Sequence, residues 1–120
     1  MDRTFLLVGA VAAFLGVTLG AFGAHGLRGR ISPEMLSVFQ TGVQYHMYHA
    51  LALILVSVMM GRMSGWLIQT AGWAFVAGIL LFSGSLYVLA ITGITILGAV
   101  TPLGGVAFLI GWACLAFAAF

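Results

Sequence analysis

The chain alternates between long apolar runs and short segments of polar and glycine residues. Four apolar runs, at about residues 4–24, 43–60, 66–90 and 101–120, are long enough to cross the ~30 Å hydrocarbon core of a bilayer as α-helices. The segments between the runs carry arginine, glycine, serine or threonine. The pattern therefore predicts an all-α fold, an integral membrane four-helix bundle that occupies residues 1–120 as a single domain.

The second run is preceded by an amphipathic extension. Ser32, Pro33 and Glu34 have the order of a helix start, with a capping hydroxyl, a proline in the first turn and an acid near the positive helix end. A helix from there to Met60 would be about 42 Å long, which exceeds the hydrocarbon core. We therefore expect an interfacial helix at about residues 33–42, with the membrane span proper after it.

Small residues recur every three or four positions in the first and fourth runs, which places them on one face of each helix. The set comprises Gly9, Ala13, Gly16, Gly20 and Gly23 in the first run, and Gly104, Ala107 and Gly111 in the fourth. In lipid, helices associate by close backbone approach at such positions. The two sets predict helix-packing faces, and they favour self-association or assembly into a larger membrane complex.

Polar side chains concentrate toward one end of the predicted bundle. Four spans put both termini on one side of the membrane, side A, and the end of the first span on the other, side B. The polar residues assigned to side B are His25, Gln44, Tyr45, Tyr48, His49, Ser83, Ser85, Tyr87 and Thr101. We expect them to form a pocket or plug in the side-B half, where His25, His49 and residues 83–87 meet, with His46 directed toward the lipid head groups.

Three interpretations of this cluster are open. The histidines could join helices by hydrogen bonds, or line a pocket for a lipid head group or quinone. Alternatively, His25, His46 and His49 could bind a metal ion, or two histidines could ligate haem. Real metal sites usually have carboxylate partners behind the imidazoles, and Glu34 is the only acid nearby. We adopt the first interpretation, which involves no metal ion and no cofactor.

Composition and charge narrow the class of protein. The chain is 63% hydrophobic and 5% charged, which excludes a soluble globular protein and makes membrane lipids its surroundings. Its few arginines are scattered, so nucleic-acid binding is excluded. No acid lies within a predicted span, which opposes proton-coupled transport and hydrolase chemistry, and we assign no catalytic residue. The single cysteine, Cys114, lies in an apolar run and is interpreted as a packed thiol.

The positive charges do not determine the orientation in the membrane. Arg3 and Arg62 fall on side A, and Arg28 and Arg30 on side B. Loops on the cytoplasmic side usually carry the excess of basic residues. Here the count is equal on the two sides, so orientation has to be inferred from something other than charge.

Four segments, at residues 20–26, 41–53, 81–87 and 101–105, resemble the YgdD/YwdK family in order and spacing. This is a domain-of-unknown-function family of small membrane proteins with bacterial and mitochondrial-type eukaryotic members. The resemblance covers essentially the whole chain, and in it the positions of His25 and His49 match better than that of His46. It implies a bacterial inner (plasma) membrane with cytoplasmic termini, but no settled activity. We therefore expect a non-enzymatic accessory or membrane-integrity factor, with a membrane binding module as the alternative.

Overall fold

The computed structural model describes residues 3–63 and 65–120 as a series of helices. In chain order these are α1 (Thr4–His25), α2 (Pro33–Met59), α3 (Trp66–Gly78), the π-helical segment η1 (Ile79–Ser83), α4 (Gly84–Thr92), the 3-10 helix η2 (Thr95–Ala99) and α5 (Thr101–Ala119). The helices α3, η1 and α4 follow one another without a break and form one rod. The described part of the chain contains four helical stretches long and apolar enough to cross a membrane, so the predicted all-α membrane architecture is confirmed.

The start of α2 matches its capping signals, but the helix is longer than a span with a separate interfacial segment would be. The Ser32 hydroxyl accepts a hydrogen bond from the Met35 N–H at 3.1 Å, and Pro33 occupies the first turn. The helix then continues without interruption into the bundle, where Phe39 and Gly42 are already buried. The first turns of α2 are thus part of the packed array.

The connection between the last two spans is more ordered than the loop expected there. The rod ends at Thr92, where Gly93 adopts a left-handed backbone conformation (φ 73°) that favours glycine. The 3-10 helix η2 follows and leads into α5, which has Pro102 in its first turn. The chain from η2 onward therefore forms the fourth membrane-length stretch.

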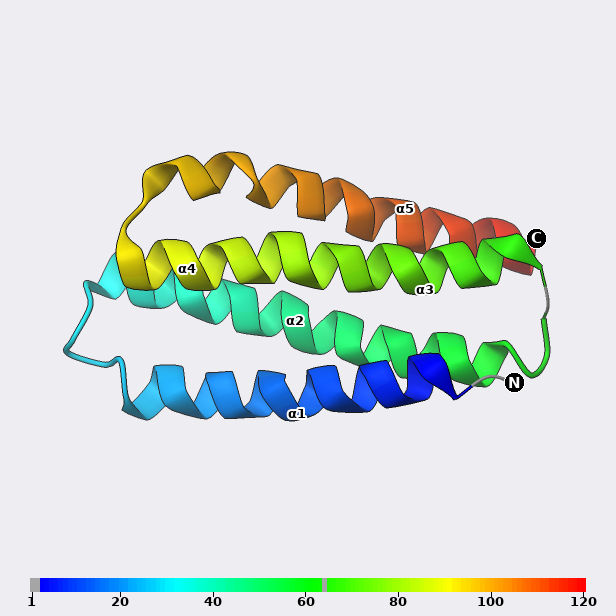
Figure 1. Cartoon of the computed structure of the whole chain (residues 1–120), viewed down its shortest axis with the longest axis horizontal. Helices are drawn as coiled ribbons and strands as arrows, with labels where there is room; N and C mark the ends of the chain where they lie inside the picture. Colours follow the sequence, from blue (N-terminus) through cyan, green and yellow to red (C-terminus); the bar gives the residue numbers. More distant parts are fainter. Residues whose placement is uncertain (1–2, 64) are drawn as a thin grey trace.

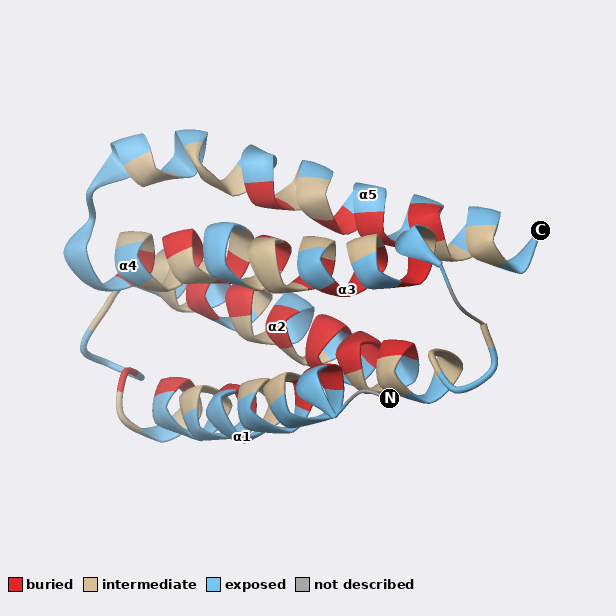
Figure 2. Ribbon diagram, turned by 45° about the vertical axis from the view of Figure 1, so that its right-hand side comes forward, coloured by how far each residue is buried: buried red, intermediate tan, exposed pale blue. Residues whose placement is uncertain are grey.

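The helices form a flattened array with principal extents of 47 × 26 × 17 Å (Figure 1). Helix α1 packs on α2, α2 packs on the α3–η1–α4 rod, and the rod packs on α5. The outer helices α1 and α5 lie at opposite edges of the array. Buried positions therefore lie where helices face one another, while the outer surfaces of all four helices stay exposed (Figure 2).

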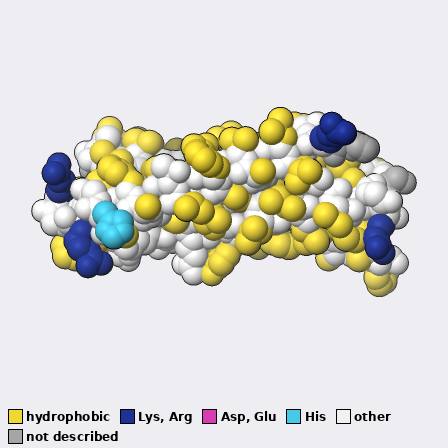
Figure 3. Space-filling model, turned by 90° about the horizontal axis from the view of Figure 1, so that it is seen from below, with side chains coloured by type: hydrophobic (Ala, Val, Ile, Leu, Met, Phe, Trp, Pro, Cys, Tyr) yellow, Lys and Arg dark blue, Asp and Glu magenta, His cyan; other side chains and the backbone are white. Residues whose placement is uncertain are grey.

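Charged and apolar side chains occupy separate parts of the surface, as expected for a protein that crosses a membrane. On the face drawn in Figure 3, basic side chains lie at the two ends of the long axis, and hydrophobic side chains cover the length between them. Arg3 precedes α1 and Arg62 follows α2 at one end, and Arg28 and Arg30 lie in the α1–α2 loop at the other. The apolar belt faces lipid and the charges reach the two aqueous surfaces.

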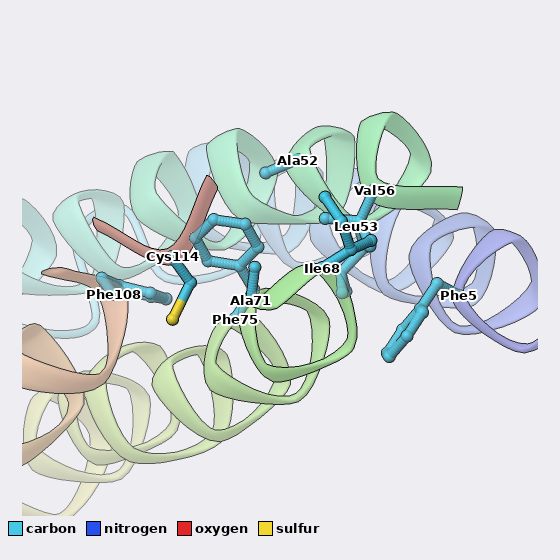
Figure 4. Packing of buried hydrophobic residues seen from close by; sticks show 9 residues of the cluster. All are labelled: Phe5, Ala52, Leu53, Val56, Ile68, Ala71, Phe75, Phe108 and Cys114. Carbon is cyan, nitrogen blue, oxygen red and sulfur yellow. The ribbon is translucent and has the colours of Figure 1, made fainter. Parts of the chain in front are cut away.

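Two apolar clusters occupy the interior. The larger, in the half nearer the termini, contains Phe5, Ala52, Leu53, Val56, Ile68, Ala71, Phe75, Phe108 and Cys114 (Figure 4). The smaller, near the α1–α2 loop, contains Leu27, Phe39 and Ala90. Cys114 is buried in the larger cluster, as a packed thiol would be. Most of the buried polar side chains lie between the two clusters, near the middle of the long axis.

Candidate functional site

Contacts made at glycines show the depth of each residue in the array. A Cβ on Gly16, near the middle of α1, would meet Met47 and the ring of His46 on α2. A Cβ on Gly78, near the middle of the rod, would meet Phe108 near the middle of α5. The hydrogen bond from Ser83 on the rod to Gly42 on α2 joins these two pairs, so the middles of all four spans lie at one level. His46 lies at that level, close to the centre of the membrane.

His46 connects three helices. Its side chain is 5% exposed. Nε2 lies 2.7 Å from the carbonyl oxygen of Ala12 on α1, and Nδ1 lies 2.8 Å from the hydroxyl of Tyr87 on α4. A carbonyl oxygen can only accept, so Nε2 carries the hydrogen and Nδ1 accepts from the Tyr87 hydroxyl. The neutral imidazole thus uses both nitrogens to tie α2 to its neighbours on two sides.

His49 connects α2 to α5 with the opposite tautomer. Its side chain is 4% exposed. Nδ1 lies 2.7 Å from the carbonyl oxygen of Tyr45, one turn earlier, and therefore carries the hydrogen. The indole N–H of Trp112 donates to Nε2 at 3.0 Å. The ring also stacks on Phe108, with centroids 3.6 Å apart and planes 6° from parallel.

Serine hydroxyls add two further links between helices. Ser83, the last residue of η1, is fully buried and donates to the carbonyl oxygen of Gly42 on α2 at 2.7 Å. The hydroxyls of Ser85 on α4 and Thr101 on α5 lie 2.5 Å apart. The η1 segment carries one extra residue per turn, a feature often found where a helix has to re-aim side chains. Here it comes just before the residues that bond α2 and α5.

The buried polar groups are fully used within the array. Within the described residues, no buried side-chain nitrogen or oxygen lacks a hydrogen-bond partner. The bonds of His46, His49, Ser83 and Ser85 join each of the four membrane-length stretches to a neighbour. The arrangement therefore resembles a network of hydrogen bonds between helices more than a site with a reactive group available to a substrate.

His25 does not belong to this cluster. It ends α1 as an exposed side chain, thirteen residues past Ala12, a rise of roughly 20 Å at the α-helical spacing. The expectation that it meets His49 is wrong because that expectation put the start of the second span at residue 43. The continuous α2 instead brings its histidines to mid-depth, not to the side-B end. The three-histidine metal site therefore does not form, and no cluster of three His, Cys, Asp or Glu side chains occurs in the described ranges.

The expectation that His46 points to head groups is also wrong. It rested on the angle between His46 and His49 on the helix, with only one of them assumed to face the interior. In the structure α2 has α1 on one side and the rod with α5 on the other, so both directions are interior. The two residues are buried on different sides of the same helix.

Gln44, Tyr45 and Tyr48 are exposed on α2. Gln44 Nε2 donates to the Tyr48 hydroxyl at 2.6 Å, and the Tyr45 ring lies against Phe82 with centroids 4.9 Å apart. The rings of Tyr45 and Tyr48 line an open groove of about 510 Å³ between α2 and α5. Of the nine residues assigned to a side-B pocket, these three and His25 are exposed. Three others, Ser83, Ser85 and His49, are buried, and Tyr87 and Thr101 are half-buried.

The main partners of the histidines were missed by sequence reasoning. Trp112 and Phe108 lie in a run that reads only as apolar, and the Ala12 carbonyl has no side-chain signal at all. One signal was available for Trp112, because an indole N–H at mid-span in the fourth run lies within the hydrocarbon layer and needs an acceptor there. Matching the middles of the four spans would have put it near His49.

The small residues of the predicted seams face other helices. A Cβ on Gly9, Gly20 or Gly23 would approach α2, at Ile54, Val43 and Phe39 respectively. On α5, Gly104 lies against the backbone of Phe82 and Gly111 against the ring of Phe75. Ala13 and Ala107 are half-buried. Gly104 is the tightest of these positions, because its neighbour is backbone that cannot turn aside.

Comparison with known sequences places the chain among small membrane proteins. A family profile described as "Protein of unknown function (DUF423)" matches residues 19–105. The chain is 57% identical over 118 residues to UPF0382 membrane protein YwdK of Bacillus subtilis (strain 168), covering 98% of this chain and 96% of the relative. It is 49% identical over 121 residues to a UPF0382 membrane protein of Staphylococcus aureus (strain bovine RF122 / ET3-1), with 98% and 96% covered. No solved structure matches the chain significantly.

Proposed function

The chain belongs to the DUF423 family of membrane proteins, and from this premise we propose that it works without catalysis of its own, as an accessory or membrane-integrity factor. In this proposal the histidine cluster is a structural element that holds four helices in one arrangement. The protein resides in the bacterial inner (plasma) membrane with both termini in the cytoplasm. The names of its similar relatives, from Bacillus and Staphylococcus, describe membrane proteins and no enzyme, which agrees with the proposal.

The observation that supports this proposal most is the use of both nitrogens of each buried histidine. His46 and His49 hold opposite neutral tautomers, each fixed by a backbone carbonyl on one nitrogen and an aromatic donor on the other. An imidazole that catalyses proton transfer or binds a metal needs a nitrogen directed at its substrate or ion. Here both nitrogens are directed at the protein itself.

The test replaces His46 by glutamine and, separately, by alanine. Glutamine keeps one donor and one acceptor, but it cannot act as an imidazole acid or base. We expect His46→Gln to keep the free energy of unfolding within about 1 kcal/mol of the wild type. His46→Ala should lower it by about 1–3 kcal/mol, because the Tyr87 hydroxyl and the Ala12 carbonyl lose the imidazole as their partner. Unfolding would be measured by detergent titration of the purified protein in bicelles.

The same variants test the role in the cell. In a bacterium that lacks its own copy of the gene, the permeability of the membrane to a charged dye should rise. The His46→Gln protein should lower the permeability again as well as the wild-type protein does. A stable His46→Gln protein that fails to restore the barrier would indicate imidazole chemistry. Unchanged permeability in the deletion strain would reject the membrane-integrity role.

A second candidate function is to hold one lipid chain. A groove of about 480 Å³ runs between α1, α2 and the rod, with apolar walls and with His46 and Tyr87 at its floor. Because the polar atoms of these two residues already bond each other, the groove suits a hydrocarbon chain better than a head group. Mass spectrometry of co-purifying lipid should then show a defined species in the wild type that Val11→Trp displaces, while Leu103→Trp on the outer surface of α5 keeps it.

A further inference from the structure

The outer face of α2 changes character halfway along the helix. After its first turn, all of its exposed residues except Tyr45 follow one another at steps of three and four, on a single stripe. The stripe reads Ser37, Gln40, Gln44, Tyr48, Leu51, Leu55 and Val58. The last three are apolar, as a lipid-facing surface requires. The first four, which we call the polar ridge, are amides and hydroxyls.

The polar ridge reaches the centre of the membrane. Gly20 on α1 faces Val43, so Gln44 lies about six residues inside the end of α1, and Tyr48 lies level with its middle. At the α-helical rise, Gln44 is roughly 6 Å from mid-depth and well within the hydrocarbon layer. An amide exposed to hydrocarbon at that depth is unfavourable, and such residues almost always face protein or a polar partner.

Gln44 and Tyr48 have hydrogen-bonding capacity left over. The Gln44 Nε2 donates to the Tyr48 oxygen at 2.6 Å. The described residues provide no partner for Gln44 Oε1, nor an acceptor for the Tyr48 O–H. The pair therefore presents one acceptor and one donor on the outer surface, side by side.

We propose that the polar ridge is the contact surface for a second copy of this chain, with α2 packed against α2 in a symmetric dimer. Both copies have the same orientation in the membrane, so the two-fold axis runs along the membrane normal and each residue meets its own counterpart at equal depth. In this contact the Tyr48 O–H of each copy donates to the Gln44 Oε1 of the other. Two identical bonds complete a closed ring of four hydrogen bonds.

A second copy fits the ridge better than a lipid does. The ridge is uncharged, and donor and acceptor stand together, so the surface is complementary to itself and repels nothing. Phospholipid ester and phosphate oxygens lie in the interfacial region, too far from Tyr48 to satisfy it. A neighbouring helix carries polar side chains at the required depth, and such residues are a known means of holding membrane helices together.

Disulfide cross-linking tests the equal-depth contact. In a Cys114→Ala background, Gln44→Cys should give a cross-linked dimer when the full chain is oxidised in native membranes. Thr18→Cys is the matched control, because Thr18 is exposed on α1 at nearly the same depth. We expect Gln44→Cys to form at least ten times more dimer than Thr18→Cys.

Equal cross-linking at the two positions would mean random collision and would overturn the proposal. So would the absence of cross-linking at Gln44→Cys in protein whose circular dichroism is that of the wild type.

A second measurement tests the hydrogen bonds. Energy transfer between labelled copies, followed as the protein is diluted in liposomes, gives the dissociation constant of the dimer. Gln44→Leu should raise it roughly tenfold, since two symmetry-related bonds are lost together. Thr18→Leu, a polar-to-apolar change at similar depth, should leave it unchanged because the Thr18 hydroxyl bonds its own helix at Phe14.

An unchanged dissociation constant for Gln44→Leu would reject the polar ridge as the contact. A wild-type chain that stays monomeric at all densities, with a carbonyl-bearing lipid bound in stoichiometric amount, would assign the ridge to that lipid instead.

Discussion

At the scale of single residues, the two buried histidines show how a membrane protein uses an ionisable side chain without a charge. Each imidazole is placed between one group that can only accept and one that can donate, so the neutral tautomer satisfies both. Protonation of His49 would put an N–H against the indole N–H of Trp112, which has no lone pair to offer. The geometry thus favours the uncharged form at mid-depth, where a charge is most unfavourable.

The bond between Trp112 and His49 can be measured by a double-mutant cycle. Trp112→Phe removes the indole N–H and should lower the free energy of unfolding by about 0.5–2 kcal/mol, near the range of hydrogen bonds between membrane helices. His49→Ala should lower it by about 2–4 kcal/mol, because the stack on Phe108 is lost and a cavity is left. The effect of Trp112→Phe should largely disappear in the His49→Ala background.

Trp66→Phe is the control for the loss of indole bulk, since Trp66 is 73% exposed at the start of α3. It should change the free energy of unfolding by less than about 0.5 kcal/mol. Additive effects of Trp112→Phe and His49→Ala would contradict a direct bond between these two side chains.

Single residues were only partly predictable from the sequence. The stretch around His49 stood out because its polar groups are rare in an apolar chain, and Ser83, Ser85 and Tyr87 stood out for the same reason. Their depth was misjudged, because polarity at residues 37–44 suggested a membrane boundary. In the structure the same polarity belongs to the outer face of α2. A one-dimensional pattern cannot separate these cases when both sides of a helix are covered by other helices.

At the scale of elements, the sequence predicts features that depend on neighbouring residues in the chain, such as helix starts and turns. It does not predict features that depend on contacts between helices. Ser32, Pro33 and Glu34 gave the start of α2, and the turn residues gave most of the breaks between spans. The π-helical segment η1 has no such signature. Its extra residue lies where Gly104 on α5 contacts the backbone of Phe82, and where Ser83 bonds the Gly42 carbonyl. The neighbours, rather than the local sequence, account for its position.

Deleting Leu80 tests what η1 does. Leu80 is 69% exposed, so its removal takes away little packing, but it converts the π-turn into an α-turn. Five π-helical residues turn the chain about as far as four α-helical residues do, so α4 should keep its rotation relative to α3. The wide turn is lost, however, and with it the fit of Gly104 against the Phe82 backbone and the hydrogen bond from Ser83 to the Gly42 carbonyl. We expect a loss of more than about 3 kcal/mol in the free energy of unfolding.

The substitution Leu80→Ala keeps the register and serves as the matched control, with an expected loss below about 1 kcal/mol. In the deletion variant, Ser83→Ala should no longer matter, whereas it should destabilise the wild type. If the deletion variant were as stable as the wild type and still sensitive to Ser83→Ala, η1 would have no role in aiming Ser83.

At the scale of the whole molecule, the flattened shape explains why so few residues are buried in an otherwise apolar chain. Each outer helix packs mainly on one neighbour, so the array leaves grooves on its faces, between α1 and the rod and between α2 and α5. In water this shape would be untenable, but lipid solvates the exposed Leu, Ile, Val and Phe side chains as well as a core would. The hydrogen bonds between helices at mid-depth then determine how the helices pack together, which hydrophobic burial cannot determine in a membrane.

The two ends of the array should be reached from opposite sides of the membrane. Arginines are equally divided between the ends, so their count favours neither orientation, and the cytoplasmic placement of the termini rests on likeness to the family.

In a Cys114→Ala background, Gly98→Cys in η2 should react with a membrane-impermeant thiol reagent added to intact cells. Gly61→Cys, in the turn after α2, should react only after the cells are permeabilised. Both glycines are exposed with room for a side chain, so accessibility alone distinguishes them. Reaction of Gly61→Cys and protection of Gly98→Cys would invert the orientation. Equal reaction of both would mean that the chain inserts in both directions, so that only copies with the same orientation could meet at Gln44 at equal depth.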